Sequence, residues 1–159
     1  MNKYRDVERK HLPQIEAILN MVNSKKGVEA ILLNESTEME DTKLSFDAIT
    51  SIGTKVSIRI RKLKYFDRFK DVTIRRVSMN GGKTELDKLK DGLGEMYFFA
   101  WADDEGIKHF IYYSIDKLRP YLDYGTDENN PDGTGLRCFS FKKLLSYNAV
   151  DSCTSSLYH

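Results

Sequence analysis

Apolar side chains recur at helical spacing in one segment near the start of the chain. The apolar positions of this segment are Ile15, Ile18, Leu19 and Val22, which follow the i, i+3, i+4, i+7 pattern of one helix face. Pro13 suits the first turn of a helix, because its missing amide hydrogen would have no intrahelical acceptor there. We therefore predict an amphipathic helix over Pro13–Val22.

Beyond residue 29 the pattern changes to the two-residue alternation that is typical of strands. It is clearest in Lys55–Arg61. One side of this segment carries Val56, Ile58 and Ile60, and the other carries Ser57, Arg59 and Arg61. A weaker alternation over residues 44–50 precedes it, and the short connection Ser51–Thr54 predicts a hairpin between the two. We also expect a short strand at Ala30–Leu33 and another strand at Asp71–Val77.

Residues 96–102, MYFFAWA, are apolar on both faces, which is the composition of a central strand covered on both sides. This pattern places Tyr97 and Trp101 in the core. After an acidic turn, His109–Ile115 is expected to be the antiparallel neighbour of that strand. Thr84 is a suitable N-cap for a short helix over Glu85–Asp91.

The last part of the chain carries weaker signals. We expect a polar loop at Asp127–Gly135, an edge strand at Arg137–Phe141, a short helix at Lys142–Tyr147 and a loose tail from Ser152. The order of elements predicts an α/β (α+β) domain, in which a mixed central β-sheet is flanked by helices. The predicted organisation is one domain over residues 1–150, followed by a loose tail over residues 151–159.

Composition narrows the class of protein. The chain has 159 residues, of which 40% are hydrophobic and 11% aromatic, and its net charge is +1. These values exclude intrinsic disorder and the coating of nucleic acid by bulk charge alone. No run of about 18 apolar residues is present to span a membrane, and the charged first residues do not resemble a signal peptide. We therefore expect a cytoplasmic protein that does not bind membranes.

Three arginines dominate the polar sides of the predicted strands. Arg59 and Arg61 lie two residues apart and so share one side of a strand, and Arg75 lies on the polar side of a later strand. A guanidinium stays charged and requires a carboxylate, a phosphate or open water. One interpretation is a solvated sheet face with ordinary ion pairs. The other is a charged site that binds a phosphate backbone, with Asp47 and Glu85 beside the arginines.

The two interpretations assign the arginines differently. Arg59 lies in the middle of its strand and is expected to pair within the fold, whereas Arg61 and Arg75 lie nearer the strand ends and are expected to contact phosphate. If the three arginines instead pair with Asp47 and Asp71 in a semi-buried network, their role is structural. Lys88 is either a further nucleic-acid contact or the surface partner of Glu85, three residues before it on the predicted helix.

Several segments in order resemble a known group of proteins. These segments are FDAITSIGTKVSIRIRK at 46–62, DVTIRR at 71–76, GGKTELDKLKDGLGEMYFFAWAD at 81–103 and IDKLR at 115–119. Together with the first helix they resemble small phage-encoded proteins of the PD-(D/E)XK nuclease superfamily, over roughly residues 8–140. The resemblance implies a restriction-endonuclease-like fold.

The resemblance also implies a degenerate active site. Asp47 matches the metal-binding Asp of the superfamily, while Arg59 and Arg61 stand where it has Glu or Gln and Lys. The helix carboxylate is matched by Glu8 or Glu16. By this likeness Asp47 and Arg61 would be catalytic, and Mg²⁺ would be held by Asp47, Asp41 and Glu16. However, Arg59 cannot bind a cation and Arg61 does not readily release a proton; Asp71 and Glu85 are further acids that could rebuild a metal site.

Two functions follow from these observations. The first is a phage or prophage protein that acts on or binds DNA, with Mg²⁺-dependent phosphodiester cleavage if the degenerate motif is active. The alternative is a catalytically inactive inhibitor that binds a host defence protein, of the anti-CRISPR type. The near-neutral net charge suits a protein partner better than DNA. Either protein would act in the host cytosol.

Overall fold

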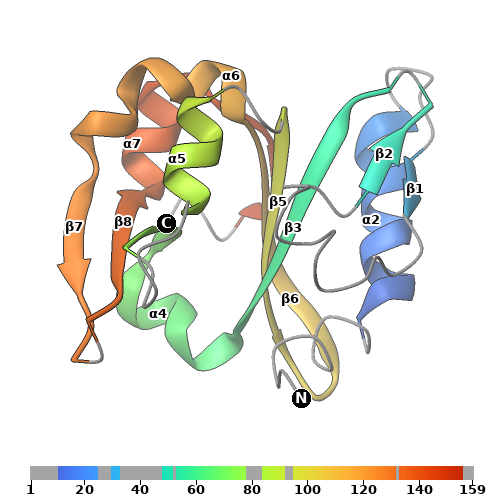
Figure 1. The fold of residues 1–159 in the computed structure, drawn as a ribbon. Coiled ribbons are helices and arrows are strands. Elements are labelled where there is room, and N and C mark those ends of the chain that lie inside the picture. The colour runs from blue at the N-terminus through green and yellow to red at the C-terminus, as the bar shows by residue number, and fades with distance from the viewer. Residues whose placement is uncertain are drawn as a thin grey trace.

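A computed structural model describes residues 11–24, 30–32, 48–51, 53–77, 84–91, 95–131 and 133–155. The fold is α+β, with two sheets and helices on both sides of the larger one, which confirms the predicted class. In Figure 1, helix α2 (Leu12–Ser24) lies on one side of the larger sheet, and the smaller sheet lies on the other. Within the described residues, no helix is long and apolar enough to cross a membrane.

The larger sheet is mixed. Its strands, in spatial order, are β1 (Ala30–Leu32), β2 (Ala48–Thr50), β3 (Lys55–Lys62), β5 (Met96–Asp103), β6 (Gly106–Ser114) and β9 (Val150–Cys153). Strands β3 and β5 pair in parallel, and all other neighbours pair antiparallel. The predicted hairpin exists as the β2–β3 pair, and the predicted pairing of the MYFFAWA strand with its successor exists as β5–β6.

Strand β5 is the central strand that its two apolar faces predict, and it contributes to two separate cores. Phe98, Ala100 and Ala102 pack with α2 and with the apolar side of β3, which confirms the predicted amphipathic helix. Tyr97, Phe99 and Trp101 point to the opposite side, where they are buried against the smaller sheet.

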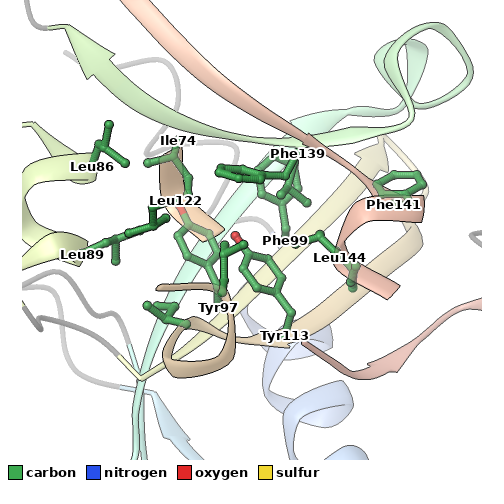
Figure 2. Close-up of a cluster of buried hydrophobic side chains, with 14 of the residues drawn as sticks. Ile74, Leu86, Leu89, Tyr97, Phe99, Tyr113, Leu122, Phe139, Phe141 and Leu144 are labelled. Carbon is green, nitrogen blue, oxygen red and sulfur yellow. The ribbon is translucent and has the colours of Figure 1, made fainter. Parts of the chain in front are cut away.

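The smaller sheet has the order β4 (Asp71–Val77), β8 (Gly135–Ser140), β7 (Thr126–Asn129). Figure 2 shows its apolar side chains, among them Ile74 and Phe139, facing Tyr97, Phe99 and Tyr113 of the larger sheet. Short helices close the ends of this second core. They are η1 (Leu63–Tyr65), α4 (Phe66–Phe69), α5 (Glu85–Lys90), α6 (Ile115–Leu118), η2 (Arg119–Tyr124) and α7 (Phe141–Ser146).

The structure corrects the expected place of three segments. Strand β4 does not continue the sheet after β3, because the partner of β3 is β5 and the apolar side of β4 is used to cover that sheet. Strand β8, expected at an edge, lies between β4 and β7. The expected loop at Asp127–Gly135 contains most of β7, and residues 152–153 of the expected loose tail pair with β6.

Candidate functional site

Arg59 is used inside the fold. Its side chain leaves the middle of β3 toward helix α5, where Nη2 donates to Glu85 Oε2 at 3.0 Å and Nε donates to Tyr97 Oη at 3.1 Å. The Tyr97 hydroxyl donates to the same Glu85 oxygen at 2.7 Å. The three groups therefore form a closed triangle, in which the guanidinium side chain is 35% exposed and the carboxylate side chain 19%. The predicted structural role of Arg59 fits this geometry.

Glu85 joins three elements at this point. It is the first residue of α5, which Thr84 caps through a capping box with Asp87. Its second oxygen, Oε1, accepts the backbone N–H of Arg75 on β4 at 3.1 Å. One carboxylate thus links β3, β5 and α5 to the smaller sheet, and both of its oxygens already accept hydrogen bonds.

Two buried tyrosines lie beneath the Arg59 triangle. The rings of Tyr97 and Tyr113 stack with centroids 5.4 Å apart, and both side chains are fully buried. Burial raises the pKa of both phenols well above the usual range, although the nearby Arg59 opposes this shift. Both hydroxyls therefore stay protonated at neutral pH, and the Tyr113 hydroxyl has no hydrogen-bond partner among the described residues.

Arg61 is held at the end of β3. Its Nη1 donates to Asp71 Oδ1 at 3.2 Å, and its guanidinium carbon lies 5.4 Å and 5.2 Å from the ring centroids of Tyr65 and Phe69. Cation–π contacts of this kind favour a guanidinium that is partly removed from water. Arg61 is thus paired with one of the two acids expected for a structural role, and its contact with phosphate stays a prediction.

Burial shifts the pKa values of one carboxyl and one thiol at the Arg61–Asp71 pair. It raises the pKa of the Asp71 carboxyl, and the opposing effect of Arg61 does not cancel that shift. Burial, with the charge of Asp71 as the next cause, raises the pKa of the Cys138 thiol to about 12. Asp71 therefore interacts with both Arg61 and the neighbouring thiol.

Of the other predicted site residues, only Arg75 and Glu16 have described side chains, and the structure does not bring these two together. The side chain of Arg75 is exposed, and the side chain of Lys88 on α5 lies outside the described residues, as do Asp47 and Asp41. Glu16 is exposed on α2, which covers the opposite face of the larger sheet from Arg59. Within the part of the chain that is described, no group of three potential metal ligands exists.

A tyrosine patch on the surface was not identified from the sequence. It consists of Tyr121 and Tyr124 on η2 and Tyr147 after α7. The rings of Tyr121 and Tyr147 stack at 4.0 Å, and Tyr124 is 65% exposed. Lys143 Nζ donates to the carbonyl of Tyr124 at 2.8 Å, so a cation lies beside the patch. In the sequence, Tyr121 and Tyr124 lie on either side of Leu122, which is buried. Their position around this apolar residue is the signal from which the patch could have been identified.

Arg137 fixes the strand that follows the tyrosine patch. Its Nε and Nη2 donate to the two carboxylate oxygens of Asp127 at 2.7 Å and 3.2 Å, and its Nη1 donates to the carbonyl of Leu122 at 3.1 Å. The hydrogen bond from Arg137 lowers the pKa of the Asp127 carboxyl. Arg76 Nε lies 3.4 Å from the same carboxylate. Strand β7 and the end of η2 are therefore held in one place.

Comparison with known proteins identifies no relative. No family model, no curated protein and no solved structure matches the chain significantly. The resemblance to the PD-(D/E)XK nucleases therefore stays a prediction.

Proposed function

We propose that this chain is a binding protein without catalytic activity and that its partner is another protein. The observation that carries the proposal is the use of Arg59 and Arg61. By the resemblance to the nuclease superfamily they stand where it has Glu or Gln and Lys, and in the structure both are paired, with Glu85, Tyr97 and Asp71.

The electrostatics of these pairs oppose metal-dependent cleavage. A nuclease requires carboxylates that are able to hold a divalent cation beside the scissile phosphate. A cation held by Glu85 or by Asp71 would replace a guanidinium there, and the displaced arginine would lose its partner in a partly buried position. Removing one partner of such a pair is costly.

The exposed surface supports a protein partner. Tyrosine is enriched at the centres of protein interfaces, where its ring supplies contact area and its hydroxyl supplies a hydrogen bond. Tyr121 and Tyr124 present such rings to solvent, with Lys143 next to them. The near-neutral charge of the whole chain also suits a protein partner. Because the sequence resembles phage-encoded proteins, a bacterial defence protein is the partner that we propose.

The experiment is capture of bacterial proteins on the immobilised chain after nuclease treatment of the lysate. We expect a defined set of proteins to be retained by the native chain and lost from the double variant Tyr121→Ser/Tyr124→Ser. Lys142→Ser, an exposed change on the neighbouring helix, is the matched control and should retain them.

A second measurement addresses the nuclease alternative directly. Calorimetry with Mn²⁺ should give no heat of binding, and plasmid and single-stranded DNA should stay intact with millimolar Mg²⁺. Cleavage that Asp47→Ala abolishes would refute the proposal. Retention that occurs only when the nuclease treatment is left out would also refute it, and would favour DNA binding through the exposed Arg75.

A further inference from the structure

Among the described residues, strand β7 forms an open edge of the smaller sheet. It is the last strand in the order β4, β8, β7, and all four of its residues are exposed. In Figure 1 it lies at the outer side of the molecule, with β8 on its inner side only. At the other edge of the same sheet, by contrast, the backbone N–H of Arg75 donates a hydrogen bond to Glu85 of α5.

The hydrogen-bond register shows which backbone groups of β7 face outward. Asn130 N donates to Thr134 O at 2.8 Å across the turn that joins β7 to β8. In an antiparallel ladder, hydrogen-bonded and non-hydrogen-bonded pairs alternate. Asn129, paired with Gly135, and Asp127, paired with Arg137, are therefore at non-hydrogen-bonded positions. Their N–H and C=O groups point away from β8 and toward solvent.

This edge is held rigidly. Asp127 is bound by two nitrogens of Arg137, and Asn129 Oδ1 accepts a hydrogen bond from Arg76. The turn after the strand contains Gly133 at φ +89°, a conformation that favours glycine. A preordered edge loses little conformational entropy when another strand pairs with it.

The charge of the edge favours a basic partner. The charge of Asp127 is matched by Arg137 and Arg76, whereas Glu128 is exposed and forms no ion pair with a described residue. Pairing with a second copy is disfavoured, because the register that uses both outward-facing residues places Glu128 opposite Glu128. Like charges directly opposite one another destabilise a strand pair.

We propose that the free edge of β7 binds an extended basic segment of a partner protein as an added strand, with a Lys or Arg side chain beside Glu128. The backbone of the added segment forms hydrogen bonds with the backbone of Asp127 and Asn129, and the charge of Glu128 favours a basic segment. This inference rests on the proposed function, in that the partner is a protein. Tyr124 lies two residues before the strand, so the tyrosine patch and this edge adjoin.

The test is NMR titration of the whole chain with a capped peptide of alternating Lys and Val. We expect the amides of Asp127 and Asn129 to shift and to become protected from hydrogen exchange. A peptide that is N-methylated at every residue should have no effect, because it has no N–H group to donate along the edge. Glu128→Lys should weaken binding of the Lys–Val peptide by about tenfold, since attraction becomes repulsion across the strand pair. It should improve binding of a Glu–Val peptide.

Glu105→Lys is the matched control, because Glu105 is an exposed carboxylate in the distant β5–β6 turn and should not affect either peptide. Unchanged Asp127 and Asn129 amides would overturn the inference. If the capture experiment still retains a protein, the proposed function stands and the partner binds elsewhere. Protection of the two amides without peptide, together with the mass of a dimer, would also overturn it in favour of a second copy.

Discussion

Replacement of Glu85 by Ala tests whether the arginine-bearing side of β3 is structural. The change removes the acceptor of three hydrogen bonds, from Arg59, Tyr97 and the backbone N–H of Arg75. The consequences differ because the donors differ in exposure. The Arg59 side chain is 35% exposed and recovers hydration, whereas the Tyr97 hydroxyl belongs to a buried side chain.

The magnitude follows from these exposures. A buried hydroxyl that loses its acceptor costs about 1–3 kcal/mol. The lost ion pair with a partly exposed guanidinium adds about 0.5–1 kcal/mol. We expect Glu85→Ala to lower the free energy of unfolding by about 2–4 kcal/mol, against a total of roughly 5–15 kcal/mol for a domain of this kind. The melting temperature should fall by about 10 °C.

Urea denaturation followed by circular dichroism measures this change. The decisive comparison is the double variant Glu85→Ala/Tyr97→Phe, which should be more stable than Glu85→Ala by about 1 kcal/mol. The buried hydroxyl hydrogen that lost its acceptor is then gone, while Arg59 Nε, which donates to the same hydroxyl, belongs to a partly exposed side chain that can be hydrated instead. Glu105→Ala removes only a surface ion pair with Lys108 and should change stability by less than about 0.5 kcal/mol. If Tyr97→Phe destabilises the Glu85→Ala variant as much as the native chain, the coupled triangle is refuted.

Four further results are expected. Phe99→Asp should abolish folding, because an unpaired carboxylate on the buried central strand costs several kcal/mol; normal circular dichroism would contradict the strand assignment. Burial lowers the pKa of His109 below 6.5, so the unfolded state binds the proton more readily and stability should fall as the pH drops through 6.5. His109→Gln should flatten that part of the stability profile, and an unchanged profile would exclude His109 as the cause. Iodoacetamide at pH 8 should label Cys153 well before Cys138, whose thiol has a pKa of about 12 and is buried; equal rates would contradict its placement. Arg75→Ala should leave the melting temperature almost unchanged because this side chain is exposed, and a large decrease would show a structural role.

The pairing of Arg61 also bears on function. The two-residue spacing in a strand shows which side chains share a face, but it does not show what packs against that face. The arginines of β3 were therefore candidates for phosphate contacts. In the structure the opposite side is occupied by α5 and β4, which supply Glu85 and Asp71. The tyrosine patch and the β7 edge therefore carry the proposed interactions.

The sequence by itself determined those elements whose apolar pattern shows which of their faces must be covered. The run MYFFAWA requires cover on both faces, and it forms the central strand β5 between two cores. The apolar stripe of Pro13–Val22 requires one covered face, and it forms α2 against the larger sheet. In these segments local composition and final burial agree, because the observed placement removes their apolar faces from water.

Only the tertiary structure decided which elements become neighbours. Nothing in Asp71–Val77 indicates that its apolar side covers a second core instead of extending the first sheet. Strand β7, with the sequence TDEN, has no apolar alternation and is a strand because β8 supplies a ladder and Arg137 an ion pair. Likewise, Arg59 pairs with Glu85, which is 26 positions away in the chain. Pairing partners are set by long-range geometry, and a periodic pattern reports only which side of an element is buried.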